Sequence, residues 1–136
     1  MRSSYLLALG ACVIALAVVL SGCVRQRTPQ HYLVPDGFSG WVYVRFDDPS
    51  CPALETRDGR QVIRFPSSGK LCTSTLYQTG TASDLWEYVQ ADGTTRPFSQ
   101  SEMPSQGAFH EPGHFESNRI GGVGLSTGPF DPSPFD

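Results

Sequence analysis

The chain has 136 residues, a formal net charge of −3 and 39% hydrophobic residues, which fits one small acidic domain. It contains 14 glycines and 11 prolines, but Lys70 is its single lysine and no basic run occurs. Binding to nucleic-acid phosphates requires clustered Lys and Arg, so this composition excludes a nucleic-acid partner.

The first 22 residues have the pattern of a secretory signal peptide. Arg2 is the only charged residue before Cys23, and it precedes an apolar run from Tyr5 to Leu20. A transmembrane helix needs about 20 apolar residues, whereas this run is shorter and ends in small residues. We therefore expect a signal helix over residues 1–22 that the mature protein lacks.

The end of this run, Leu20-Ser21-Gly22-Cys23, resembles the lipobox of bacterial lipoproteins. The resemblance implies signal cleavage between Gly22 and Cys23, and attachment of acyl chains such as palmitate to Cys23. Several acyl chains hold a protein firmly on a bilayer, because each buried methylene contributes about 0.8 kcal/mol. We expect a lipid-anchored protein of the cell envelope. By resemblance to the sorting rule of enteric bacteria, Val24 in place of Asp favours the outer membrane in a Gram-negative organism.

Residues 23–31 form a short polar stretch that we interpret as a lipidated tether. Its Arg25 and Arg27 are close enough to the anchor to attract anionic head groups, but we favour the interpretation that they belong to a solvated tether.

Two cysteines remain in the mature chain after the signal and the lipid site are set aside. Cys51 and Cys72 are an even pair in an exported chain, which predicts a disulfide. The alternative is a redox or metal-binding pair, but their spacing is far from C-x-x-C. Closing a loop of this length stabilises a fold by about 3 kcal/mol.

Short runs of β-branched and aromatic residues between turn residues predict strands along the mature chain. In residues 41–46, the alternate side chains of Val42, Val44 and Phe46 suit a core. A hairpin is predicted from Asp92-Gly93, and Pro97 places its returning strand at a sheet edge. The predicted strands are 31–35, 41–46, 60–66, 71–77, 85–89 and 94–98, with one or two more around 109 and 115–120.

These elements predict an all-β domain of about six strands over residues 32–120, a small sandwich or an open barrel. No mature segment has a helical apolar period without interruption by Gly or Pro. Residues 121–136 form a tail rich in Gly and Pro, which we expect to be flexible.

Residues 110–114 match H-E-x-x-H, the pattern of zinc proteases. That chemistry requires both histidines on one face of a helix, and the intervening Pro112 and Gly113 oppose a helix. We therefore predict no metal site, although a loop could still bring His110 and His114 to an ion. Glu111 or Glu116 would then be the third ligand.

Four aromatic residues allow two interpretations. Trp41, Tyr43, Trp86 and Tyr88 either fill one side of a core or form an aromatic face for sugars or peptides. A small sandwich needs large side chains inside it, which favours the core.

Residues 32–46, YLVPDGFSGWVYVRF, resemble a motif of uncharacterised small bacterial exported proteins and lipoproteins. That motif reads Tyr-Leu-Ile/Val-Pro-x-Gly-Phe/Tyr-x-Gly-Trp, and residues 58–75 resemble the segment that follows it. The likeness covers residues 31–100. It implies a shared fold and brings no catalytic residues.

The chain has no G-x-S-x-G elbow and no P-loop, so we expect neither an enzyme nor a cofactor. The first hypothesis is an envelope lipoprotein that binds a protein or cell-wall partner. The second is an inhibitor or immunity lipoprotein directed against a toxin or a lysozyme-like enzyme. The third, a metal-dependent hydrolase, would use His110, Glu111 and His114.

Overall fold

The computed structural model describes residues 24–110, 115–121 and 129–136, and it divides into two compact units. The described part of the first unit joins residues 24–27 to residues 79–81 through a parallel bridge between Gln26 and Thr81. The second unit, Thr28–Gln78 and Ala82–Asp136, is the β-domain. The predicted signal helix and Cys23 lie outside the described residues.

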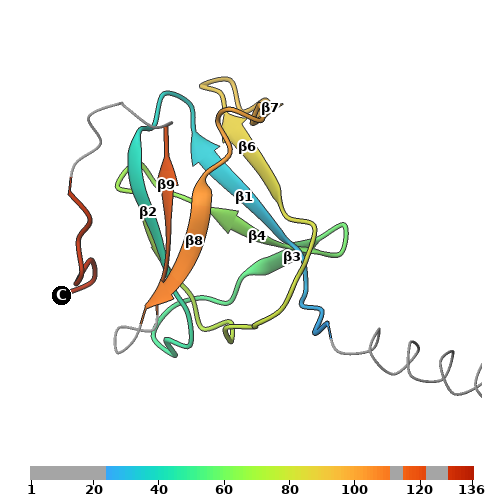
Figure 1. Ribbon diagram of the computed structural model, residues 1–136, viewed down its shortest axis with the longest axis vertical. Helices are drawn as coiled ribbons and strands as arrows, with labels where there is room; N and C mark the ends of the chain where they lie inside the picture. Colours follow the sequence, from blue (N-terminus) through green and yellow to red (C-terminus); the bar gives the residue numbers. More distant parts are fainter. Residues whose placement is uncertain (1–23, 111–114, 122–128) are drawn as a thin grey trace, which may run out of the picture. The chain divides into compact units, whose positions relative to one another are not determined.

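The described residues of the β-domain form nine strands and no helix, which confirms the all-β prediction. The strands make two mixed sheets that do not close into a barrel, so the domain is sandwich-like (Figure 1). One sheet has the order β3-β4-β1-β6-β7, and the other has the order β5-β2-β9-β8. The strands are β1 (Gln30–Pro35), β2 (Gly40–Arg45), β3 (Glu55–Arg57), β4 (Arg60–Arg64), β5 (Lys70–Cys72), β6 (Leu85–Val89), β7 (Thr95–Pro97), β8 (Ser105–His110) and β9 (Phe115–Ile120).

The central strand of each sheet makes parallel pairs with strands that are distant in sequence. Strand β1 is parallel to both β4 and β6, while β2 is parallel to β5 and antiparallel to β9. The predicted hairpin is present, because β6 pairs antiparallel with β7. Strand β7 lies at a sheet edge, as Pro97 predicted.

Strand β1 begins before the expected start of the domain. The backbone N–H of Gln30 donates to Asp84 Oδ1 over 2.9 Å, and the Gln30 side chain is buried. Gln30 and His31, which the sequence assigned to the tether, therefore belong to the sheet.

The core lies between the two sheets and follows the alternation expected of strands. Val42, Val44 and Phe46 are buried in it, as predicted, together with Trp86 and Tyr88 of β6. Trp41 and Tyr43 occupy the intervening positions of β2 and point to the opposite side of their sheet. The four aromatic residues are thus divided between the core and the outer surface. The full core is Tyr32, Val34, Val42, Val44, Phe46, Ile63, Phe65, Trp86, Tyr88, Phe98 and Ile120.

One polar group crosses the interior and connects the sheets. The Tyr32 ring stacks on Trp86 with a centroid separation of 3.9 Å. The Tyr32 hydroxyl, on β1, lies 2.8 Å from Glu116 Oε1 on β9 and 2.5 Å from Gln30 Oε1. Asn118 Nδ2 donates to the same Glu116 oxygen over 2.8 Å. These bonds satisfy polar groups that would otherwise be costly to bury.

The variant Tyr32→Phe is expected to lower the free energy of unfolding by about 1–3 kcal/mol, because Glu116 and Gln30 lose a buried donor. Urea denaturation monitored by tryptophan fluorescence measures this change. The control is Tyr88→Phe, whose hydroxyl makes no hydrogen bond to a described residue although its ring lies in the same core. Equal effects of the two substitutions would show that the bond between the sheets contributes nothing.

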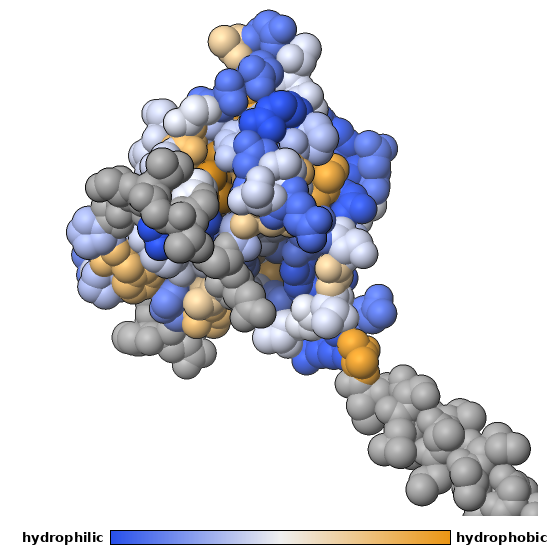
Figure 2. Space-filling model, turned by 45° about the horizontal axis from the view of Figure 1, so that its top comes forward, coloured by the Kyte–Doolittle hydropathy of each residue, from blue (hydrophilic) through white to orange (hydrophobic). Residues whose placement is uncertain are grey.

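Residues 129–136, which the sequence placed in a flexible tail, lie against the four-stranded sheet, beside β2 (Figure 1). Pro134 is buried there. Elsewhere, Figure 2 shows a surface on which hydrophilic residues predominate and hydrophobic residues form small separate groups. In the part of the chain that the structure describes, no helix has the length and hydrophobicity needed to cross a bilayer.

Candidate functional site

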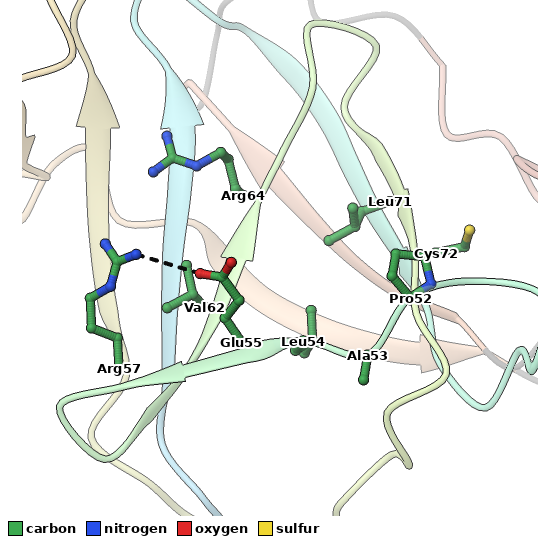
Figure 3. Close-up of a pocket in the computed structure, with 9 residues that line it drawn as sticks. All are labelled: Pro52, Ala53, Leu54, Glu55, Arg57, Val62, Arg64, Leu71 and Cys72. Carbon is green, nitrogen blue, oxygen red and sulfur yellow. Dashed lines mark hydrogen bonds and ion pairs between the residues drawn. The ribbon is translucent and has the colours of Figure 1, made fainter.

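A cleft of about 360 Å³ opens where edge strands of the two sheets approach each other (Figure 3). Strand β3 is an edge of the five-stranded sheet and β5 is an edge of the four-stranded sheet, and both contribute to its walls. We call it the edge cleft. Its lining residues are Pro52, Ala53, Leu54, Glu55, Arg57, Val62, Arg64, Leu71 and Cys72.

The charged wall of the edge cleft is built by the β3–β4 hairpin. Asp58 and Gly59 both have positive φ, 51° and 73°, which is the backbone that a two-residue hairpin turn requires. This turn sets Glu55 opposite Val62. Arg64 is two residues beyond Val62 and therefore shares its face of β4.

The opposite wall is held by covalent and hydrogen bonds. A disulfide joins Cys51 to Cys72, the pair that the sequence predicted. Next to it, the buried Thr73 donates its hydroxyl to the Pro52 carbonyl over 2.9 Å, and Leu54 N donates to Thr75 Oγ1 over 2.9 Å. A wall fixed in this way is preorganised, so a ligand would not lose affinity by ordering it.

The edge cleft combines an apolar floor with a positive rim. Leu54 and Leu71 pack against the core and present their remaining surface to the cleft. Arg57 and Glu55 form a pair at 3.4 Å, with 64% and 76% of their side chains exposed, so water weakens it strongly. Arg64 is exposed and makes no hydrogen bond or ion pair with a described residue. The cleft therefore suits an apolar group that lies next to a carboxylate or phosphate.

The structure describes two of the four candidate metal ligands, His110 and Glu116, and it separates them. His110 ends strand β8, and its Nε2 lies 2.6 Å from Ser117 Oγ. Its ring stacks on Phe115 at 4.8 Å, on the outer side of the sheet. Glu116 points to the other side, toward Tyr32. The expectation that Glu116 could join His110 at one ion is therefore wrong; Glu111 and His114 lie outside the described residues.

One group of potential metal ligands does occur among the described residues, but its atoms already bond to one another or to neighbouring side chains. Asp48, Cys51 and Cys72 present ligand atoms within 4.8 Å of one another, and both sulfurs are in the disulfide. Hydrogen bonds from Ser50 lower the pKa of the Asp48 carboxyl, and Arg45 Nη2 lies 2.5 Å from Asp48 Oδ2. Asp48 thus fixes the turn after β2.

Comparison with known families identifies the β-domain. A family of unknown function, DUF6843, matches residues 26–119. The chain belongs to this family. The match contains every residue that lines the edge cleft, and it ends before residues 129–136. Membership in the DUF6843 family agrees with the resemblance to an uncharacterised family that the sequence indicated.

A solved structure shares the DUF6843 fold seen here. It is a crystal structure of a "Putative Lipoprotein from Bacillus anthracis", with a TM-score of 0.60 and 23% sequence identity. The similarity covers 70% of this chain and 71% of that one. None of the curated proteins compared with the chain matches it.

Sequence reasoning located the disulfide of the edge cleft but missed its charged rim. Arg57 and Arg64 lie in short strands, and the sequence pattern gives them no motif. Only the meeting of two sheet edges makes them neighbours of Leu54 and Leu71.

Proposed function

We propose that this DUF6843 protein is a lipid-anchored envelope protein whose β-domain is a non-enzymatic binding module. Its edge cleft binds an apolar segment of a partner protein that carries a carboxylate. The observation that supports this proposal is the guanidinium of Arg64, which has no partner among the described residues and lies beside an apolar floor in a cleft with a disulfide-braced wall.

The anchor in this proposal rests on Leu20-Ser21-Gly22-Cys23, which follows an apolar run of signal-peptide length. The description of the Bacillus anthracis protein as a lipoprotein is compatible with such an anchor. In a Gram-negative organism, Val24 after the lipidated cysteine favours the outer membrane.

The cleft is tested by capturing partners from gently cross-linked native envelopes and quantifying them by mass spectrometry. Arg64→Glu should reduce recovery of the principal partner at least about tenfold, because it replaces a charge-assisted contact with a repulsion. The matched control is Arg96→Glu, which makes the same charge change on β7, at the other edge of the five-stranded sheet. Unchanged recovery of the partner with Arg64→Glu, or an equal loss with both variants, would show that the edge cleft does not bind the partner.

The captured protein also distinguishes a structural binder from an inhibitor. A toxin or lysozyme-like hydrolase, inhibited by the purified protein in stoichiometric amounts, would identify the inhibitor hypothesis as the correct one. A wall or membrane assembly component whose activity is unaffected would support the binding module.

A further inference from the structure

The outer side of the four-stranded sheet carries a cluster of aromatic side chains, which we call the aromatic face. It consists of Trp41 and Tyr43 on β2, His110 on β8 and Phe115 on β9. The strand pairing brings them together, because Trp41 is opposite Arg119, Tyr43 is opposite Ser117, and His110 is opposite Phe115. An aromatic surface of this kind needs a covering group in water.

Residues 129–136, which we call the C-terminal segment, cover the aromatic face through two phenylalanines. The Phe130 ring contacts Trp41 edge-on at 5.2 Å and lies 4.9 Å from the His110 ring. The Phe135 ring contacts Phe115 at 6.2 Å and lies 4.9 Å below the Arg45 guanidinium. Aromatic and cation–π contacts of this type each contribute favourably to binding.

Polar contacts fix the position of the C-terminal segment between these two rings. The Asp131 N–H donates to the Tyr43 hydroxyl over 2.9 Å, and Asp131 Oδ2 lies 3.6 Å from Lys70 Nζ. Asp131 Oδ1 accepts from Ser133 N over 2.9 Å, which turns the chain toward the buried Pro134. Burial raises the pKa of the Tyr43 hydroxyl, as expected for a group that the segment shields from water.

The C-terminal segment is attached as a peptide ligand would be. None of its described residues joins a strand, and a hydrogen bond from the Asp131 N–H to the Tyr43 hydroxyl ties it to the sheet. It lies outside the residues that match the family, and residues 122–128, which include three glycines, separate it from β9. Side-chain anchors in pockets, rather than a ladder of backbone bonds, therefore hold it.

We propose that the aromatic face is a second binding site, for an extended segment of another protein that has two phenylalanines flanking Asp-Pro-x-Pro. The C-terminal segment is its internal competitor. The positive charge of Lys70 selects an acidic residue between the two rings. The rings are received by Trp41, Tyr43, Phe115 and the face of the Arg45 guanidinium. This site is independent of the edge cleft, because the two share none of these residues.

The experiment uses the full mature chain and a fluorescent peptide with the sequence of residues 128–136. Phe130→Ala/Phe135→Ala removes both anchors of the internal competitor. A tethered competitor acts at a millimolar effective concentration, so this variant should bind the peptide at least about tenfold more tightly than the unaltered protein. The matched control is the same peptide with both phenylalanines replaced by alanine, which should not bind.

A folded double variant that binds the two peptides equally weakly would overturn the proposal.

If the double variant fails to fold, hydrogen exchange of the unaltered chain shows whether the C-terminal segment detaches from the aromatic face. The Asp131 amide should exchange at least about a hundredfold faster than core amides of β2, because the segment detaches without unfolding the domain. Equal exchange rates would make the segment a structural part of the domain. If the unaltered chain forms a dimer and the double variant does not, the ligand of the aromatic face is the C-terminal segment of a second copy. That result would overturn the proposal that the ligand belongs to another protein.

Discussion

Removal of the disulfide by Cys51→Ala/Cys72→Ala is expected to lower the free energy of unfolding by about 3 kcal/mol. The bond closes a loop between residues that are 21 positions apart, which restricts the unfolded chain. In the folded state it joins the turn after β2 to the end of β5. Small domains have a total stability of about 5–15 kcal/mol, so the loss is a large fraction of it.

Urea denaturation of the double variant and of the parent measures this loss. The parent in reducing agent should match the variant, whereas the variant itself should not respond to the reducing agent. Cys72 also lines the edge cleft, so the variant should capture less of the partner under conditions where it remains folded. A stability change below about 1 kcal/mol would show that neighbouring hydrogen bonds, such as Thr73 to Pro52, hold the wall without the disulfide.

The fold could be predicted where local pattern and tertiary environment agree. Residues 41–46 alternate apolar side chains, and the structure buries one set of them in the core. Asp92-Gly93 forms a turn, and it joins the two strands expected on either side. Strand β3 was missed because Glu-Thr-Arg has no apolar alternation; it forms only because the turn at 58–59 folds it onto β4.

The candidate sites depend on long-range pairing, which a single sequence does not reveal. The edge cleft exists because β3 and β5, each three residues long, lie at the edges of separate sheets. Alternation placed Val42 and Val44 in the core and therefore Trp41 and Tyr43 on the other side of β2, but it could not tell that a distant segment covers this other side. Phe130 and Phe135 lie in a stretch dense in Pro and Gly, where no periodic pattern indicates packing.

The geometry of β8 and β9 also explains why His110 and Glu116 do not meet at one metal ion. In a helix, residues one turn apart share a face, whereas neighbouring strand positions alternate between faces. His110 consequently joins the aromatic face, and Glu116 joins Tyr32 between the sheets.

The variant Cys23→Ser is expected to abolish membrane association of the mature protein or to block its processing. Acyl chains on Cys23 would bury many methylene groups at about 0.8 kcal/mol each, and no spanning helix occurs in the described residues to replace them. Arg25 and Arg27 would leave at most a weak attraction to anionic head groups, which salt screens. Fractionation of cells followed by a high-salt wash separates these contributions.

The matched control for this experiment is Cys12→Ser, which alters a cysteine inside the predicted signal peptide and leaves Cys23 intact. This control should remain in the membrane fraction at the mature size. Cys23→Ser found there at the same size, and resistant to salt, would contradict a lipid anchor. The domain would then need another means of attachment, and the edge cleft and the aromatic face would be the surfaces to test, through Arg64→Glu and through Phe130→Ala/Phe135→Ala.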